Sequence, residues 1–340
     1  MVTKTNTSSP TISVFRIAIL IVVIPLLISC SNDDDDDELL GNWVDRSIFD
    51  GTPRSGAFYF TIGNKGYMGT GYDGDDRLTD VWEYDMEGNF WSQLVSFPGT
   101  PRSSAVGFTV NGNGYVGLGY DGDNELRDFY RLNISANTWD VLSDFGGSAR
   151  RGALAFNSTT NGYVGTGFDG DNDKKDFWRY EPSNDSWTEL VGFGGNKRRD
   201  GTTFTIDNNV YLGTGVSNGL NLTDFWVFNL DSETWSPLLD LDDDDDYSIV
   251  RNNAVGFAVG DKGYISTGAF STTGGTVSTW EYNPSTDLWE EKTEYEGIVR
   301  QGAIGFYNGS RAFVGLGRSG TLYLDDNREF FPNQEEDEDD

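Results

Sequence analysis

Six arginines recur at the same place in a repeated sequence pattern, and their chemistry suits the binding of anions. A guanidinium group can hold a carboxylate through two parallel hydrogen bonds, so a ring of such groups could bind an acidic sugar. Each arginine could instead pair with a nearby Asp and tie loops together. Both interpretations stay open from the sequence alone. The six residues are Arg54, Arg102, Arg150, Arg198, Arg251 and Arg300.

Three Asp-Gly-Asp triplets are the candidates for a metal site. Calcium is coordinated by several oxygen ligands, which these carboxylates could supply. The triplets lack the spacing and the closing Glu of an EF-hand loop, and Asp-Gly is also common in tight turns. The acidic run at 242–246 is a further calcium candidate, and no other cofactor is expected. The triplet residues are Asp73, Asp75, Asp121, Asp123, Asp169 and Asp171.

The composition excludes several classes of function. The 340 residues include no His, so catalytic triads that need imidazole and His-ligated zinc, copper or haem are excluded. The formal net charge is -31, and binding to DNA or RNA depends on Lys and Arg neutralising phosphates. A nucleic-acid partner is therefore not expected.

The elements that must position these residues come from an internal repeat. Five tryptophans stand 48 residues apart, and a sixth follows after 54. Tyrosines keep the same spacing, and each of the six arginines is followed six residues later by Phe. A repeat of this length implies one structural unit per copy. The tryptophans are Trp43, Trp91, Trp139, Trp187, Trp235 and Trp289.

One copy, residues 102–142, illustrates the predicted unit. Short runs of apolar, aromatic and β-branched residues are separated by Asn-Gly, Asp-Gly and Ser-Ala-Asn turn sequences, which predicts four strands. We expect them at 105–110, 114–119, 128–132 and 137–142. Gly117 and Gly119 are expected to let an aromatic side chain of a neighbouring sheet approach closely. No segment shows a helical period.

The repeated motifs resemble the Kelch repeat. The motifs are Arg-x-x-Ala, Gly-Tyr-x-Gly-x-Gly, Asp-aromatic-aromatic-x-Tyr and a later Trp, and several of their positions recur in at least five copies. The resemblance implies an all-β, six-bladed Kelch-type β-propeller over residues 41–332, with about 50 residues and four strands per blade. The sixth copy lacks its Trp, so we expect an N-terminal strand containing Trp43 to close the last blade. Residues 333–340 are expected to form a disordered acidic tail.

The N-terminal segment predicts export and lipid anchoring. Residues 17–28 are apolar but too few to span a bilayer, which needs about 20, and they suit a signal peptide over residues 1–29. The sequence up to Cys30 resembles the lipobox of bacterial lipoproteins, which implies that Cys30 is lipidated and that 30–40 is an acidic tether. The acidic run 33–38 after Cys30 also resembles the export signal that sends certain Gram-negative lipoproteins to the outer face of the outer membrane. Together these resemblances imply an outer-membrane protein that faces the exterior and contacts the membrane through its lipid alone.

The predicted function is non-catalytic binding of a protein or glycan by a monomer, through the loop-rich propeller face. This step rests on analogy with other Kelch propellers. The alternative is a sugar epimerase or mutarotase resembling the six-bladed bacterial sialic acid mutarotase. It would need a general acid or base in the channel, for which Glu125, Glu294 and Glu296 are candidates. A lone acid deep in the channel would favour the enzyme, and a fully paired Arg-Asp ring would favour binding or structure.

Overall fold

The structure is a computed structural model that describes residues 1–6, 39–244, 246–270 and 274–337. Cys30 and nearly all of the predicted signal peptide and tether lie outside the described residues. The chain divides into two units, 1–38 and 39–340, and the second contains all the named strands. The described residues contain no helix long and apolar enough to cross a membrane.

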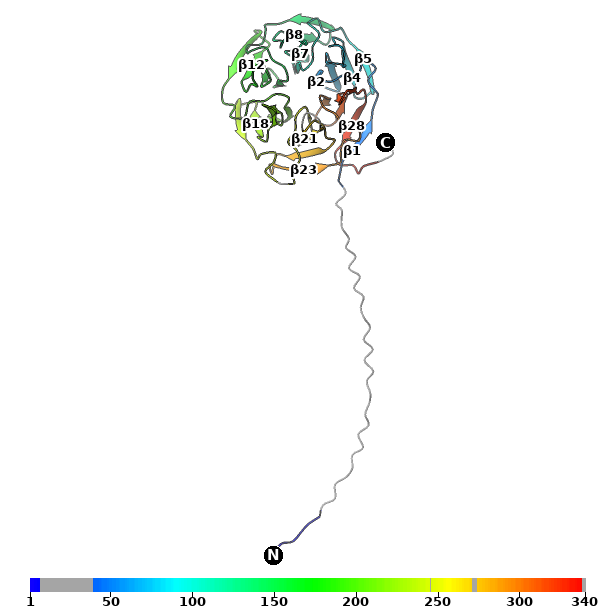
Figure 1. Ribbon diagram of the computed structural model, residues 1–340, viewed down its shortest axis with the longest axis vertical. Coiled ribbons are helices and arrows are strands. Elements are labelled where there is room, and N and C mark those ends of the chain that lie inside the picture. The colour runs from blue at the N-terminus through cyan, green and yellow to red at the C-terminus, as the bar shows by residue number, and fades with distance from the viewer. Residues whose placement is uncertain (7–38, 245, 271–273, 338–340) are drawn as a thin grey trace. The chain divides into compact units, whose positions relative to one another are not determined.

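Six four-stranded antiparallel sheets form a ring, the predicted propeller (Figure 1). The first blade is β2 (Phe58–Ile62), β3 (Lys65–Gly69), β4 (Val81–Asp85) and β5 (Phe90–Gln93). The second is β6 (Val106–Val110), β7 (Asn113–Gly117), β8 (Phe129–Asn133) and β9 (Thr138–Val141). The third is β10 (Leu154–Asn157), β11 (Gly162–Gly165), β12 (Phe177–Glu181) and β13 (Ser186–Leu190).

The remaining blades follow the same order around the ring. The fourth is β14 (Thr202–Ile206), β15 (Asn209–Gly213), β18 (Trp226–Asn229) and β19 (Thr234–Pro237). The fifth is β20 (Val255–Val259), β21 (Lys262–Ser266), β22 (Thr279–Asn283) and β23 (Leu288–Lys292). The sixth is β24 (Ile304–Tyr307), β25 (Ala312–Gly315), β28 (Asn327–Phe331) and β1 (Asn42–Asp45).

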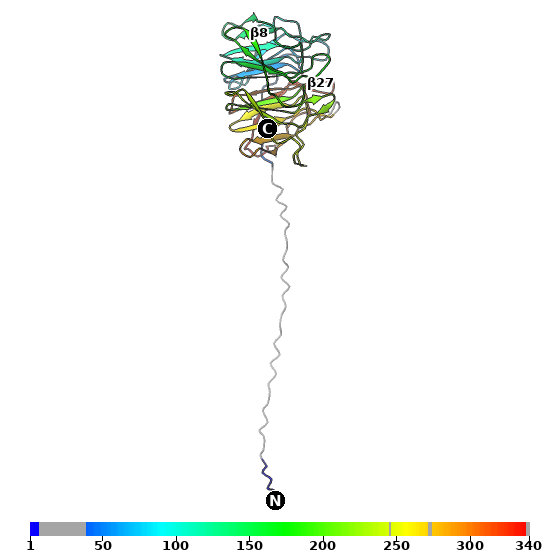
Figure 2. The same cartoon turned by 90° about the vertical axis from the view of Figure 1, so that its left-hand side faces the viewer.

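Two short hairpins extend from one face of the ring. They are β16 (Val216–Ser217) with β17 (Leu220–Asn221), and β26 (Arg318–Ser319) with β27 (Leu322–Tyr323). Both lie in the connection from the second to the third strand of a blade. We call this side the mouth face; β27 marks it in the side view of Figure 2.

The N-terminal strand closes the ring, as the missing tryptophan of the sixth copy predicts. β1 pairs with β28, with Trp43 opposite Phe330, and Trp43 is completely buried. The buried Glu329 receives ion pairs from Arg46 and Arg311 at 2.7 and 2.5 Å. In the predicted tail, the carbonyl of Gln334 accepts the backbone N–H of Gly41 at 2.7 Å, and Asp337 donates its backbone N–H to Oδ1 of Asn42, in β1, at 3.2 Å. The described part of the tail therefore contacts the closing strand.

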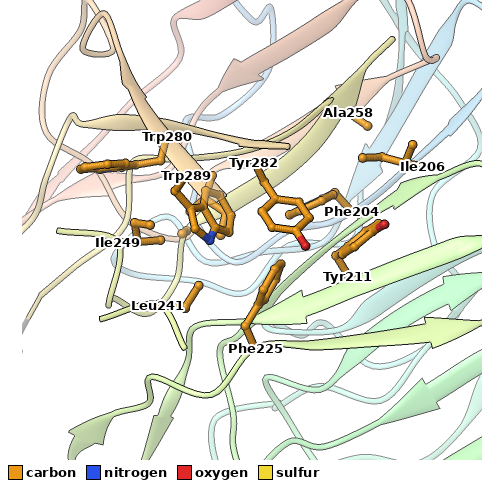
Figure 3. Close-up of a cluster of buried hydrophobic side chains, with 12 residues drawn as sticks. Phe204, Ile206, Tyr211, Phe225, Leu241, Ile249, Ala258, Trp280, Tyr282 and Trp289 are labelled. Carbon is orange, nitrogen blue, oxygen red and sulfur yellow. The ribbon is translucent and has the colours of Figure 1, made fainter. Parts of the chain in front are cut away.

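Aromatic side chains fill the space between neighbouring blades. Figure 3 shows one such cluster, in which Phe204, Tyr211 and Phe225 of the fourth blade meet Tyr282 and Trp289 of the fifth. The ring centroids of Phe225 and Trp289 lie 5.3 Å apart. The in-phase aromatic residues of the sequence are therefore mainly the packing layer between blades.

The glycines that admit a neighbouring aromatic ring are not the predicted pair. Gly114, at the start of the Gly-Tyr motif, lies directly under Phe60 of the preceding blade. Gly117 instead accommodates Phe129 of its own blade, and Gly119 has a φ of 103°, a conformation that favours glycine. The expectation for Gly117 and Gly119 was wrong, because the side chain of a neighbouring blade reaches the opposite end of the second strand.

Candidate functional site

Each of the six recurring arginines, called here the tie arginines, is enclosed by its own blade. In the second blade, Nε of Arg102 donates to the carbonyl of Thr100 at 2.9 Å, and Nη1 donates to that of Leu118 at 3.0 Å. Both terminal nitrogens donate to the carboxylate of Asp128, at 2.5 and 2.7 Å. The guanidinium carbon lies 4.9 Å from the ring centroid of Phe97. Hydrogen bonds and an aromatic face thus surround this cation.

The same enclosure recurs around the ring. All six tie arginines are at most 1% exposed, and five pair with an Asp that lies 26 residues later. Arg251 instead donates to the hydroxyl and the carbonyl of Ser278, at 2.8 and 2.9 Å. Burial lowers the pKa of Arg251 to about 9, although Glu291 acts in the opposite direction. The five carboxylate partners are Asp80, Asp128, Asp176, Asp224 and Asp326.

This geometry matches the alternative in which each arginine ties loops of its own blade together. A buried guanidinium with protein acceptors on its nitrogens offers a ligand no open face. The ligand site that we propose therefore does not include the tie arginines.

The Asp-Gly-Asp triplets have the geometry of turns. Oδ1 of Asp121 accepts the backbone N–H groups of Asp123 and Asn124, at 2.8 and 2.7 Å. Asp73 and Asp169 make the equivalent bonds, and Asp169 also pairs with Lys174. Among the described residues, no group of three or more Asp, Glu, His or Cys is arranged to hold a metal ion. Calcium enters neither function proposed below.

The other acidic candidates lie in different surroundings. Glu125 pairs with Arg151 at 3.0 Å on the mouth face. Glu296 accepts the backbone N–H of Trp43 at 3.0 Å, so it belongs to the ring closure, and Glu294 is exposed. In the described part of the 242–246 run the side chains are exposed. None of these residues lines the channel cavity.

A closed ring of backbone hydrogen bonds surrounds the channel at the start of the innermost strands. Each of its six residues donates its N–H to the carbonyl of the equivalent residue in the preceding blade, at 2.7–3.2 Å. All six have φ between 52° and 63°, the left-handed region. We call them the mouth ring: Gly56, Ser104, Gly152, Asp200, Asn253 and Gly302.

A cavity of about 370 Å³ lies within the channel, and the mouth ring is part of its lining. Small residues at or next to the innermost strands form part of its lining, among them Ala57, Gly107 and Gly305. Tyr59 lines it, and burial raises the pKa of Tyr59 to about 12, which keeps its hydroxyl able to donate. Tyr307 reaches across to the fourth blade, where its hydroxyl accepts the N–H of Thr205 at 3.2 Å.

Asp200 is the mouth-ring residue with a titratable side chain. Its carboxylate lies against Gly152 of the third blade, where a larger residue would displace it. Burial raises its pKa to about 6; the charges of Arg199 and Arg151 lower it, and that of Asp173 raises it further. The nearest guanidinium nitrogen, Nε of Arg199, is 3.7 Å away. A carboxyl group with this pKa can exchange protons near neutral pH.

Aromatic rings and arginines alternate along one side of the mouth. Guanidinium carbons lie 4.4–5.2 Å from the centroids of the rings that they cover. The row begins in the sixth blade, continues through the first, second and third blades, and ends in the fourth. All its members are half-buried. We call it the stacked row: Tyr323, Tyr72, Arg77, Tyr120, Arg151, Phe168 and Arg199.

Sequence reasoning missed Asp200 and the stacked row, although the repeat contains a signal for both. Arg151 and Arg199 directly follow a tie arginine, where the first two copies have Ser. Asp200 stands at the next position, which is Gly in three of the six copies. The six copies share the tie arginine but differ at the two positions that follow it. A comparison of the copies at these two positions would have identified side chains that make the mouth asymmetric.

Comparisons with known proteins support the fold. No family model matches the chain, and no curated protein matches it. The solved structure of YjhT is similar, with a TM-score of 0.71 and 15% sequence identity, over 83% of this chain and 96% of that one. At this identity the likeness shows the fold alone, which is a six-bladed β-propeller.

Proposed function

We propose that this protein binds a glycan at the mouth of its propeller channel. The observation that carries the proposal is the cavity of about 370 Å³ behind the mouth ring. Its volume lies within the range of small-molecule sites, about 300–1,000 Å³. Hydroxyl, amide and carboxyl side chains line it, including those of Ser104, Tyr59, Thr203 and Asp200. Such groups suit the many hydroxyls of a sugar.

The stacked row supports a glycan that extends beyond the cavity. Arg151 and Arg199 immediately precede two mouth-ring residues in the chain, so the row borders the opening. Stacking and ion pairs hold its side chains in place before any ligand binds, which reduces the entropy lost on binding.

Calorimetry of the protein against a panel of neutral and acidic oligosaccharides tests this proposal. We expect binding of at least one glycan and a loss of affinity in Asp200→Gly, since Gly keeps the left-handed backbone but removes the carboxyl group. Asn111→Gly is the matched control, because Asn111 has a φ of 51° in the exposed hairpin turn between β6 and β7. A panel without binding, or equal loss in both variants, would contradict the proposal.

The second candidate is a sugar epimerase or mutarotase, and the raised pKa of Asp200 favours it. Anomer exchange needs a group that gives and takes protons near neutral pH, and Asp200 lies in the channel lining. If the bound sugar is turned over, the rate of anomer exchange followed by NMR should change with pH around 6, and Asp200→Asn should abolish this dependence. Binding without faster exchange would leave the non-catalytic function.

We also propose that the repeats belong to the Kelch family and that the protein acts as a monomer on the outer face of the outer membrane, held by lipid on Cys30. The support is the apolar run before Cys30 and the acidic segment after it. Labelled palmitate should be incorporated into the native chain but not into Cys30→Ser. Labelling of both proteins to the same extent would contradict the anchor.

A further inference from the structure

Neighbouring blades are joined on the mouth face by a pair of polar side chains at equivalent positions. One member follows the second strand of a blade, and the other directly follows the tie arginine of the next blade. At the junction of the second and third blades the pair is Glu125 and Arg151, at 3.0 Å. At the next junction Asp173 and Arg199 pair at 2.6 Å.

The junction of the first and second blades has a cation but lacks the side chain of opposite charge that would pair with it. Arg77 stands 48 residues before Glu125, at the position of the acid, and Ser103 stands 48 residues before Arg151. Among the described residues, no carboxylate lies within ion-pair distance of Arg77, and its buried Nε has no hydrogen-bond partner. An arginine without an ion pair is notable in a chain with 55 acidic residues against 24 basic ones.

The side chain of Arg77 is nevertheless held in a defined place. Its guanidinium carbon lies 5.1 Å from the ring centroid of Tyr72 and 4.9 Å from that of Tyr120. Both tyrosine hydroxyls donate to carbonyls of their own loops, those of Gly74 and Gly122, so the two rings are fixed. A Cβ on Gly122 would lie 2.7 Å from Nη1 of Arg77, so the cation extends over the loop of the second blade.

The flanking acids do not neutralise Arg77. Oδ1 of Asp121 accepts the backbone N–H groups of Asn124 and Asp123 in its own turn, and these bonds are the main reason that the pKa of Asp121 is lowered, with a smaller contribution from the charge of Arg77. Asp73 caps its turn in the same way. The terminal nitrogens of Arg77 therefore remain available to a planar anion.

We propose that Arg77 binds the carboxylate of a uronic-acid type sugar within a glycan held at the mouth. This rests on the proposed glycan-binding function and adds the class of sugar. Arg77 stands where the next two junctions have Glu125 and Asp173, so the ligand carboxylate takes the place that Arg151 and Arg199 occupy there, with the charges reversed. Ser103 stands at that position of the repeat, and its side chain is shorter than that of arginine.

The test compares binding of tri-galacturonic acid with binding of its methyl ester, which keeps the sugars but removes the charge. We expect the native protein to prefer the acid, and Arg77→Gln to lose about tenfold or more in affinity for the acid alone. Ser103→Asp should have a similar effect, because it gives Arg77 a partner within the protein. Arg127→Gln is the matched control, since Arg127 is exposed and pairs with Asp144 at 3.1 Å.

The outcomes separate this inference from the proposed function. Equal affinity for acid and ester, or unchanged acid binding in Arg77→Gln, would overturn the role of Arg77 while leaving glycan binding intact. Preference for a sulfated oligosaccharide over the uronate would overturn the assignment of a carboxylate. No binding of any glycan would remove both proposals. Unchanged thermal unfolding of Arg77→Gln would show that a loss of affinity reflects the site and not the fold.

Discussion

Arg251 donates a hydrogen bond to the hydroxyl of Ser278 at 2.8 Å, where the other five tie arginines hold a carboxylate. The fifth blade therefore contains a buried cation without a counter-charge at the repeat position. Burial of such a charge lowers stability unless it is paired.

Supplying the missing carboxylate should stabilise the fifth blade. We expect Ser278→Asp to raise the free energy of unfolding by about 1 kcal/mol at pH 7, through a charge-assisted hydrogen bond. The reverse change in the second blade, Asp128→Ser, should cost about 3 kcal/mol, because it leaves Arg102 buried and unpaired. Urea unfolding midpoints measure both. A destabilised Ser278→Asp would mean that the fifth blade has no space for the carboxylate.

Asp200 should make stability depend on pH in a recognisable way. Its folded-state pKa of about 6 lies above the value near 4 of an unfolded Asp, so the folded protein holds this proton more tightly. The stabilisation that the protonated Asp200 gives to the folded state is greatest below about pH 4 and is lost as the pH rises through 6. The free energy of unfolding of Asp200→Asn should thus exceed that of the native chain by up to about 2 kcal/mol at pH 8, and the two should be equal at pH 4.

The comparison of the two proteins at each pH is the control for this prediction. Several other carboxylates, among them Asp80 and Asp176, act in the opposite direction. Burial raises the pKa of Asp80, but hydrogen bonds and charge from Arg54 outweigh burial and lower it overall. Its stabilising effect is lost in acid in both proteins and cancels from the difference. A difference that is flat between pH 4 and pH 8 would show that the Asp200 carboxyl is not buried as described.

The closing strand should be essential to the sixth blade. Trp43 is 0% exposed and its ring lies 4.8 Å from that of Tyr295. We expect Trp43→Ala to lower the free energy of unfolding by about 3–5 kcal/mol and to expose the N-terminal strand to proteases. Phe90→Ala is the control, because Phe90 lies in the outer strand of the first blade and is 49% exposed. Equal effects of the two changes would contradict closure by β1.

Two glycines should respond to alanine in opposite directions. Gly114→Ala pushes a methyl group into the ring of Phe60, which should destabilise the interface between blades by about 1–3 kcal/mol. Gly201→Ala should be neutral or stabilising by about 0.5 kcal/mol, because the other five copies have Ala at that position and the unfolded chain loses freedom. Thermal unfolding of both variants checks the packing that the structure shows.

The repeat spacing predicted the fold because packing between identical blades needs the same residue types at the same place in every copy. Trp43 predicted the closure for the same reason, and the four strands expected in 102–142 lie within about two residues of β6–β9. The candidate site was harder to predict, because it consists of residues that differ between copies. Arg77, Arg199 and Asp200 become neighbours of the mouth only through contacts between blades, and the raised pKa of Asp200 depends on burial that no spacing reveals.

In the mouth ring, backbone groups form the framework of the opening, and side chains supply its chemistry. Its hydrogen bonds join backbone groups only, so they do not depend on which side chains the six residues carry. The left-handed backbone restricts the choice to Gly and short polar residues such as Asn, Asp and Ser, the types that are present. In a related propeller, any of the six positions could therefore hold a carboxyl, an amide or a hydroxyl group, or no side chain at all. Such a change could alter which ligand is recognised while the blades keep their structure.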